Sequence, residues 1–426
     1  MRTDLLVDPR VGIVRRLVRR PTPAHFPASY TIVDSYLADT TVFCRHAADS
    51  AGAGYAFADE ARATAAAVGE AAERYCGNLV PPGLRTGSSR DIEDAINPAA
   101  FAVFSAGQYR EPGFPCVPFT DDLALAWAAG TDLGSGRPVA VPASLVWPSH
   151  AAAAPRTNPI IQAGLAAGPS LAAAQWSALC EVIERDAMVL AWMGRGGLHR
   201  LDPPAHLCRL GRGPTGALHT RWYAFPTEVR MPVVGALVRD ASTGHLALGM
   251  GCHPDLVTAH DKALGEALQL LILLGDYDDP DGAFAHAARR PDSPLKPWRP
   301  ARDYAAAYRP DLRDAVDYGC HLQLHLDPAI QELFETELDD AVIDTGPVWD
   351  PPADLAAAVR RLDAVGHRVV SVDVTTDDVR TAGLHVARIL VPGFYSNSAV
   401  GLPFLGGARL GRSLAGRPPR LVPMPH

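Results

Sequence analysis

Lysine is almost absent from this chain of 426 residues, in which Lys262 and Lys296 are the only two. A Walker A phosphate-binding loop needs a lysine that follows a glycine, and neither lysine does, so a P-loop is excluded. The net charge is −8. The chain therefore also lacks the strongly basic balance that is typical of dedicated nucleic-acid-binding proteins.

Long hydrophobic runs and paired cysteines are missing as well. No apolar run approaches the ~20 residues of a membrane-spanning helix, and the N-terminal region has no apolar stretch long enough for a signal peptide. The seven cysteines are odd in number and none forms a CxxC pair, which argues against a disulfide framework and against a zinc site. We therefore expect a cytoplasmic protein with no membrane partner.

Several common catalytic motifs are missing or incomplete. No Gly-x-Ser-x-Gly nucleophile elbow occurs. Residues 211–216 fit Gly-x-Gly-x-x-Gly, but they follow no clear strand and contain Pro214, so a dinucleotide site is not indicated. His321 and His325 are spaced to share a helix face, but no third metal ligand accompanies them. None of these sites is favoured.

The composition that is present, 48% hydrophobic and 20% charged residues, is that of a globular protein. Strand-like and helix-like runs are mixed along the whole length, which predicts an α/β (mixed α+β) fold in one large domain, residues 1–426. Breaker-rich stretches predict loop excursions near 149–159, 194–216 and 286–301, and a Pro/Arg-rich C-terminal tail over 409–426. The strand-like runs are 233–239, 368–374 and 386–391, and the helix-like runs are 59–75, 171–192, 256–275 and 353–364.

One short pattern occurs three times, each time within a predicted helix. It reads Ala, apolar, small, Glu, two apolar residues, then Glu or Gln, and it covers residues 67–73, 178–184 and 263–269. Each copy follows a stretch that contains glycine. The spacing between copies is too irregular for a solenoid, so the pattern predicts three related strand–turn–helix units inside a single domain.

These repeated acids predict a metal site. Residues three apart share a helix face, and the apolar neighbours predict that this face turns inward, where clustered carboxylates need a cation. Oxygen ligands without His or Cys favour Mg²⁺, which proteins usually bind together with substrate phosphates. The alternative for any single copy is a solvated acidic face. The predicted metal ligands are Glu70, Glu73, Glu181, Glu184 and Glu266, and Arg74 and Arg185 are placed to contact phosphate.

The motifs around these acids resemble those of the YcaO-domain family. Residues 177–187 are similar to its Ser-x-x-x-Glu-x-x-Glu-Arg helix, and residues 164–168 are similar to the glycine-rich entry to that helix. The resemblance runs from about Val7 to the last residue, and the combination of motifs makes it specific. Further similar segments are 70–76 (EAAERYC), 266–269 (Glu-x-x-Gln), 373–378 (Asp-x-Thr) and 391–393 (Val-Pro-Gly).

The resemblance implies a YcaO-like architecture that binds ATP and Mg²⁺ on the acidic helices. The implied activity is that of an ATP-dependent cyclodehydratase, which forms thiazoline or oxazoline rings in a ribosomally synthesised precursor peptide. A Cys, Ser or Thr side chain attacks the preceding amide carbon, the former carbonyl oxygen is phosphorylated by ATP, and phosphate then leaves. The nucleotide contacts that the resemblance implies are Ser177, Arg185, Glu181, Glu184, Gln269 and Arg74.

Three alternatives to azoline formation stay open at this point. External sulfide would give a thioamide, and an amine nucleophile would give an amidine, on the same fold. The chain could also be a non-catalytic peptide-binding subunit, because Gln162 and Ala163 stand where family members often have Ser-Asn.

The C-terminus resembles that of azoline-forming members, which tend to end in alternating prolines that reach the active site. Here Pro423 and Pro425 alternate before His426, so the resemblance implies a catalytic role for these three residues. A solvated, disordered tail is the alternative. No ThiF-like or winged-helix domain is visible, so we expect a separate leader-peptide-binding partner protein that delivers the precursor peptide. A homodimer is compatible with the resemblance.

Overall fold

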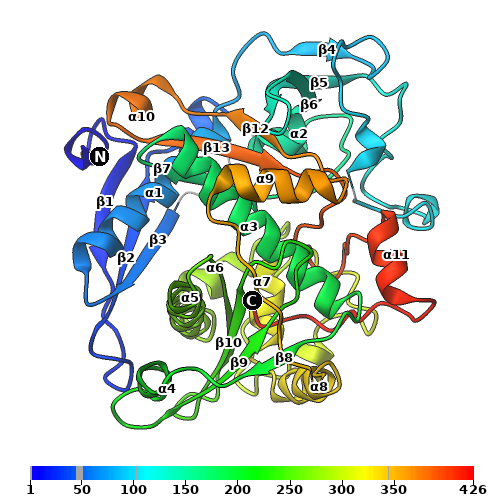
Figure 1. The fold of residues 1–426 in the computed structure, drawn as a ribbon. Coiled ribbons are helices and arrows are strands. Elements are labelled where there is room, and N and C mark those ends of the chain that lie inside the picture. Colours follow the sequence, from blue (N-terminus) through cyan, green and yellow to red (C-terminus); the bar gives the residue numbers. More distant parts are fainter. Residues whose placement is uncertain (1, 45–50, 102, 344) are drawn as a thin grey trace.

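The structure is a computed structural model that describes residues 2–44, 51–101, 103–343 and 345–426. In these ranges the chain forms three antiparallel sheets, and each is covered by one long helix (Figure 1). The α/β class predicted from the sequence is confirmed. Each of the three long helices carries one copy of the acidic pattern and directly follows a strand of the sheet that it covers.

The first sheet has the order β1-β2-β3. Its strands are β1 (Val14–Arg19), β2 (Tyr30–Leu37) and β3 (Ala51–Phe57). Helix α1 (Glu60–Asn78) follows β3 and packs across β3 and β2. It begins at Asp59, whose carboxylate accepts a hydrogen bond from the backbone N–H of Arg62 and so caps the helix.

The second sheet has the order β11-β10-β9-β8. Its strands are β8 (His199–Leu201), β9 (Leu218–Ala224), β10 (Val233–Asp240) and β11 (Leu246–Cys252). Helix α5 (Leu256–Tyr277) covers one face, where Val234, Ala236 and Val238 join its core cluster. The alternate residue Leu237 joins the opposite cluster, together with Phe334 of helix α8 (Pro328–Asp339). The sheet is therefore buried on both faces.

The third sheet has the order β4-β5-β12-β13-β7, with β6 paired to β5. Helix α3 (Leu171–Trp192) follows β7 and packs against β7 and β13, and α9 (Leu355–Ala364) packs on α3. The strands are β4 (Arg85–Gly87), β5 (Leu125–Asp132), β6 (Pro138–Pro142), β7 (Leu165–Gly168), β12 (Val370–Asp373) and β13 (His385–Leu390). The short helices are α2 (Ala143–Val146), α4 (Ala205–Arg212), α6 (Ala283–Ala287), α7 (Tyr318–Leu324), α10 (Asp377–Thr381) and α11 (Ala408–Leu414).

Glycine lets the first and third helices approach their strands at backbone contact distance. A Cβ atom on Gly54 would lie 2.2 Å from the backbone nitrogen of Ala67, and one on Gly249 would lie 2.1 Å from the backbone oxygen of Ala263. Both contacts are to helix backbone, which cannot move aside as a flexible side chain can. The glycine-bearing stretches that precede the acidic pattern thus serve close strand–helix packing.

Replacing Gly249 with alanine is therefore expected to lower the free energy of unfolding by about 1–3 kcal/mol or more, because the added methyl group overpacks β11 against α5. Chemical denaturation measures the effect. The matched control is Gly275→Ala on α5, where a Cβ atom meets nothing within 4 Å and alanine is the better helix former. Equal stability of the two variants would contradict this account of the glycine pattern.

Two predicted loop regions contain regular structure. Residues 194–216 hold β8 and α4, and Leu207 and Gly211 of α4 are buried. The breakers in this stretch flank the helix, since Pro204 is its N-cap and Gly213, at a φ of 63°, is its C-cap. The predicted tail over 409–426 likewise begins within α11. Residues 149–159 open in a short 3₁₀ turn (Pro148–Ala152), and 286–301 contain only the end of α6.

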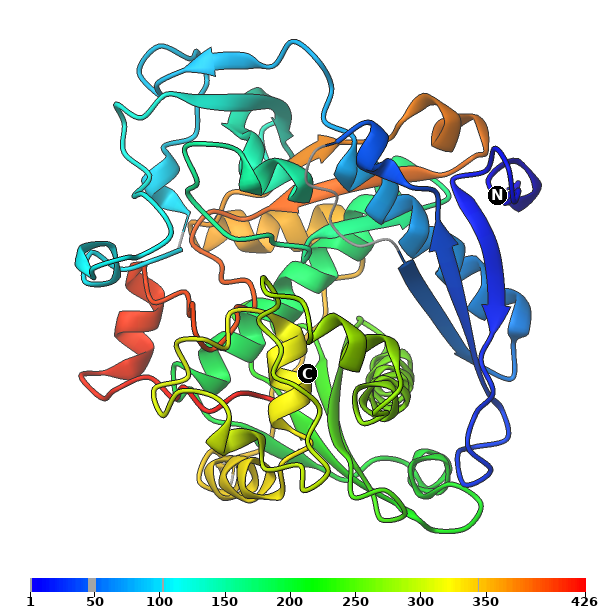
Figure 2. The same ribbon diagram turned by 180° about the vertical axis from the view of Figure 1, so that it is seen from behind.

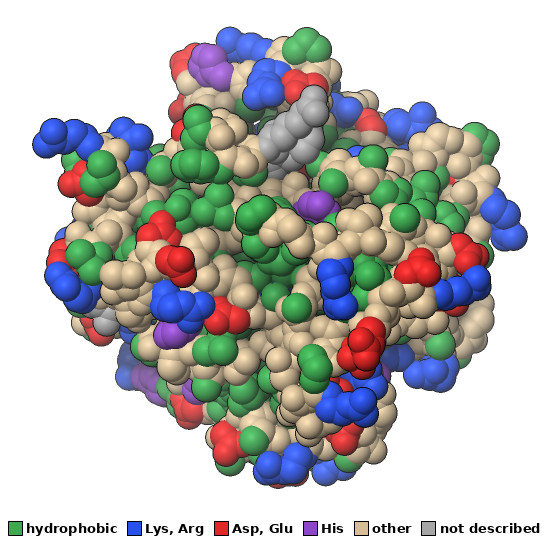
Figure 3. Space-filling view, turned by 90° about the horizontal axis from the view of Figure 1, so that it is seen from above, with side chains coloured by type: hydrophobic (Ala, Val, Ile, Leu, Met, Phe, Trp, Pro, Cys, Tyr) green, Lys and Arg blue, Asp and Glu red, His purple; other side chains and the backbone are tan. Residues whose placement is uncertain are grey.

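The chain end lies inside the molecule and not on a free arm. In opposite views, the label C stands near the middle of the ribbon (Figures 1 and 2). Seen from above, acidic and basic side chains are interspersed on the surface, with no broad patch of one sign on that face (Figure 3). Among the residues described, no helix combines the length and the apolar character needed to cross a membrane.

Candidate functional site

The first carboxylate of each acidic pair is held by the backbone at the strand that precedes its own helix. All three accept a hydrogen bond from a backbone N–H that lies 16 or 17 residues earlier. This shared contact fixes the three carboxylates in equivalent positions. The pairs are Ala53 to Glu70 at 2.8 Å, Gly164 to Glu181 at 2.9 Å and Met250 to Glu266 at 2.5 Å.

The second acid reaches the strand of the following unit. Glu73 of α1 accepts a hydrogen bond of 2.7 Å from the backbone N–H of Ala167 in β7. Glu184 of α3 accepts one from the backbone N–H of Cys252 in β11. These contacts join the three sheets around a common centre.

That centre is a cavity of about 690 Å³. Acids from all three units line it, so segments far apart in the sequence converge as the acidic pattern predicts. Gln269 is the exception: it lies one turn beyond Glu266, half-buried, and is not among the lining residues. The predicted residues that line the cavity are Glu70, Glu73, Arg74, Ser177, Glu181, Glu184, Arg185 and Glu266.

Burial makes negative charge costly here. It raises the pKa of Glu73 to about 8, and the nearby charge of Glu70 adds to the effect while Arg74 opposes it. Burial also raises the pKa values of Glu181 and Glu184, against the attraction of Arg185. A bound cation would relieve this cost.

Two arginines tie the cluster together. Arg185 lies 3.4 Å from a carboxylate oxygen of Glu184 and 3.6 Å from one of Glu266, so it links the second unit to the third. Arg74 donates to Glu70 at 2.7 Å and to the side-chain oxygen of Gln162 at 2.9 Å. Both guanidinium groups face the cavity and can pair with an anion there.

Among the lining residues, three with polar side chains were not predicted as site residues: Tyr55, Gln162 and Lys262. Lys262 precedes Glu266 by one helical turn on α5, so helical spacing alone could have identified it. Gln162 occupies the position that departs from the family pattern. Gln162 accepts a hydrogen bond from Arg74 and lines the acidic cavity, so this position belongs to the site.

The side chains present fit Mg²⁺ bound together with phosphate groups. Five carboxylates line the cavity against three basic groups, Arg74, Arg185 and Lys262. No three His, Cys, Asp or Glu side chains in the described part of the chain already converge as a metal-binding group. This is compatible with Mg²⁺, which commonly uses one or two protein carboxylates and completes its shell with phosphate oxygens and water.

The C-terminal residues pack against Arg185, and the Nδ1 of His426 also lies 3.8 Å from a carboxylate oxygen of Glu266. The Nε2 of His426 contacts Arg185, and its Nδ1 lies 3.0 Å from the carbonyl oxygen of Leu248. Pro423 and Pro425 are buried, and the Pro425 carbonyl accepts a 2.7 Å hydrogen bond from the Leu248 N–H. The alternative of a solvated tail is therefore wrong.

His325 anchors this tail and should make stability depend on pH. Its Nε2 lies 2.8 Å from the Pro423 carbonyl oxygen, and burial lowers its pKa to about 4. In the unfolded chain a histidine titrates near 6.5, so the unfolded state gains a proton first as the pH falls. The folded protein is therefore expected to lose up to about 3 kcal/mol of stability between pH 6.5 and 4 through this group.

Replacing His325 with glutamine removes the titration and leaves a donor for the Pro423 carbonyl. Unfolding free energies measured at pH 7 and pH 4 should fall less for this variant than for the wild-type protein. Parallel pH profiles would show that His325 does not titrate as described.

Comparison with known proteins identifies a family. Residues 54–395 match the family model described as YcaO cyclodehydratase, binding ATP and Mg²⁺. A protein of Rhizobium leguminosarum bv. trifolii, described as an uncharacterized protein in the tfuA 3′ region, is 30% identical over a segment covering 36% of this chain and 41% of that protein.

Solved structures with the same fold include three of particular interest. A heterocyclase in complex with substrate and cofactor has a TM-score of 0.61 and 21% identity, covering 92% of this chain and 51% of that one. YcaO from Methanopyrus kandleri, bound with AMPPCP and Mg²⁺, has a TM-score of 0.57 and 20% identity, and the match covers 89% of this chain and 86% of that one. The E. coli microcin synthetase McbBCD complex has a TM-score of 0.61 and 15% identity, covering 96% of both chains. This chain thus spans about half of the first structure.

Proposed function

This chain belongs to the YcaO family, which binds ATP and Mg²⁺, and on that premise we propose that it is an ATP-dependent cyclodehydratase acting on a ribosomally synthesised precursor peptide. The observation that carries the proposal is the meeting of acids from three separate helices in one cavity with Arg74, Arg185 and Lys262. Phosphoryl transfer depends mostly on positioning and charge neutralisation, which these side chains can supply.

In this proposal the acids and the arginines of the cavity have different roles. Glu181, Glu184 and Glu266 surround Arg185, and with Glu70 and Glu73 they offer the carboxylate oxygens that would hold Mg²⁺. Arg74 and Arg185 would neutralise phosphate oxygens, and the exposed Ser177 at the rim would contact the nucleotide. When bound, Mg²⁺ supplies charge neutralisation for the triphosphate. Gln269 has no part in this proposal, because it does not line the cavity.

The tail would act through Arg185. His426 contacts the guanidinium without lining the cavity itself, and Pro423 and Pro425 set the position of His426 through their carbonyl hydrogen bonds. We propose that these three residues position Arg185 for the reaction. A precursor peptide would be the substrate, delivered by a separate leader-peptide-binding partner. The occurrence of the similar E. coli chain in a microcin synthetase complex that was also solved with pro-MccB17 bound supports that choice.

The test is incubation of the chain with ATP, Mg²⁺ and precursor peptides encoded by neighbouring genes, with and without their candidate partner proteins. Mass spectrometry should detect the loss of one water for each ring, and only when ATP is present. Exchange of oxygen for sulfur would instead identify a thioamide-forming enzyme, and peptide binding without any ATP-dependent mass change would identify a non-catalytic subunit. Either outcome would overturn the cyclodehydratase proposal.

A further inference from the structure

A second large cavity, of about 680 Å³, lies at the edge of the four-stranded sheet. Residues of β8, α4, β9, β10 and α8 line it, and none of them lines the acidic cavity. We call it the β9 groove. The proposed reaction leaves this groove without a role.

The groove runs along an open strand edge. β8 pairs with β9 only over residues 222–224, and β8 is the last strand of the sheet. On this side, residues 218–221 of β9 have no partner strand in the described part of the chain, and all four line the groove. An exposed strand edge is a template on which an extended peptide can pair through its main chain.

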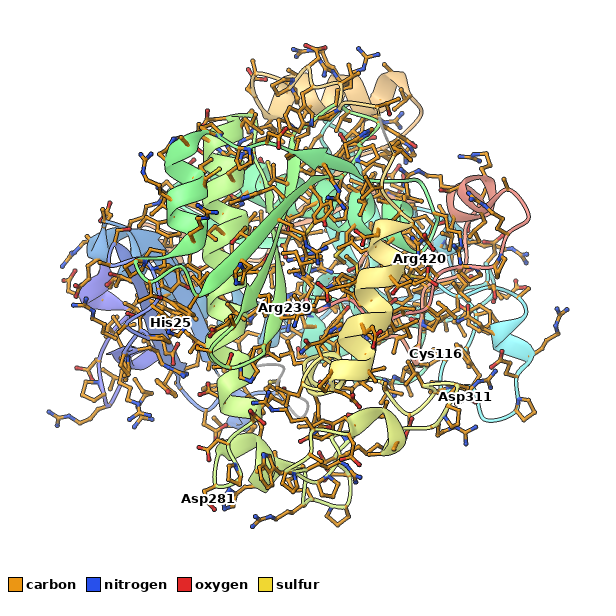
Figure 4. All side chains as sticks on the ribbon, turned by 90° about the horizontal axis from the view of Figure 1, so that it is seen from below. His25, Cys116, Arg239, Asp281, Asp311 and Arg420 are labelled. Atoms are coloured by element: carbon orange, nitrogen blue, oxygen red, sulfur yellow. The ribbon has the colours of Figure 1, made fainter. Side chains whose placement is uncertain are left out.

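The lining is basic although the whole chain is acidic. Four arginines face two acids in the groove, whereas the net charge of the chain is −8. Two acids of α8 pair with three of these arginines. Glu335 contacts Arg221 and Arg239, and Asp339 lies 3.0 Å from Arg200 and 3.8 Å from Arg221. Arg239 lies on the underside of the molecule between the sheet and α8 (Figure 4). Arg212, at the end of α4, has no acidic partner among the described residues. The lining arginines are Arg200, Arg212, Arg221 and Arg239.

Tyr223 adds to this basic surface a hydroxyl group that makes no hydrogen bond within the described part of the chain. The side chain is 1% exposed and lines the groove, and its hydroxyl has no hydrogen-bond partner among the described residues. Arg200 and Arg221 act on it electrostatically. A buried hydroxyl without a partner is destabilising. A carboxylate in the groove would accept its hydrogen bond while pairing with the arginines.

We propose that the β9 groove binds an acidic stretch of the precursor peptide, outside the residues that are modified, as an added strand on β9. The choice of the precursor as partner rests on the proposed function, but the binding does not. Backbone hydrogen bonds to residues 218–221 give affinity, and the arginines and Tyr223 select acidic side chains. The substrate would thereby be held at a second point, away from the acidic cavity.

The test uses a fluorescein-labelled synthetic peptide of about ten alternating Glu and Val residues, an extended acidic probe, and fluorescence anisotropy with the full chain. Tyr223→Phe should weaken binding about tenfold, because it removes one hydrogen bond to a charged group. Its thermal stability should not fall, since the lost hydroxyl has no partner in the free protein. Arg212→Glu should also weaken binding, whereas Arg209→Glu on the same helix does not face the groove and should not.

A peptide of alternating Lys and Val serves as the charge control and should bind more weakly than the acidic probe. The Glu181→Ala variant should bind the acidic probe as tightly as the wild-type chain, and Tyr223→Phe should keep wild-type ATP hydrolysis. These two variants distinguish a groove that does not bind the acidic probe from a protein that does not carry out the proposed reaction. Absence of binding, equal binding of both peptides, or unchanged affinity in Tyr223→Phe and Arg212→Glu would overturn the assignment.

Discussion

Replacing Glu181 with alanine is expected to lower ATP turnover by about 100-fold to 1,000-fold, the cost of losing one preorganised charge-stabilising group. Glu181 lines the acidic cavity, is fixed by the Gly164 N–H, and lies 4.0 Å from Arg185. Its loss removes a proposed metal ligand and one of the carboxylates that compensate the charge of Arg185. Phosphate release measured at saturating ATP and Mg²⁺ reports the effect.

The matched control is Glu332→Ala, an exposed glutamate on helix α8 outside the cavity. Its ATP turnover should equal that of the wild-type protein. Far-ultraviolet circular dichroism and thermal unfolding establish that Glu181→Ala is folded. A folded Glu181→Ala variant with wild-type turnover would show that the nucleotide does not depend on this carboxylate.

Replacing Asp186 with alanine is expected to lower the free energy of unfolding by about 3–5 kcal/mol, because it leaves a buried guanidinium without its main partner. Asp186 follows Arg185 on α3, and it accepts hydrogen bonds of 2.5 and 2.8 Å from Arg409 of α11. The Tyr395 N–H also donates to it. Asp186 and Arg409 are 7% and 8% exposed, so solvent screens the pair little.

Chemical denaturation at neutral pH measures this loss. Arg412→Ala removes an exposed arginine from the same helix α11 and should change stability by less than about 0.5 kcal/mol. Because the Asp186–Arg409 pair joins helix α3 to the start of the C-terminal segment, Asp186→Ala should also expose the tail to proteolysis after Arg417 or Arg420. Stability equal to that of Arg412→Ala would show that this pair does not hold the tail.

Local sequence patterns predicted the elements and the acidic surfaces well. The helix expected over 171–192 is α3 with the same bounds, and those expected over 59–75 and 256–275 differ from α1 and α5 by a few residues. Helix-forming residues and capping signals are local, so a sequence carries them directly. The same applies to the i, i+3 spacing that places each acidic pair on one face.

Long-range contacts explain what the sequence did not predict. Spacing cannot tell which position of a pair faces the cavity, and Gln269 does not line it although Glu266 does. The ordered tail depends on Arg409, which pairs with Asp186 across 223 residues of sequence. The sequence does not predict helix α4, because Pro204 and Gly213, which mark its two ends, are equally typical of a loop.

The most direct test of the proposed nucleotide site is a crystal structure of the full chain with a non-hydrolysable ATP analogue and Mg²⁺. We expect the triphosphate between α1, α3 and α5, with Mg²⁺ about 2.0–2.1 Å from at least one oxygen of the five cavity glutamates and a phosphate oxygen paired with Arg74 or Arg185. A nucleotide bound elsewhere, or one in the cavity whose Mg²⁺ touches none of these carboxylates, would contradict it.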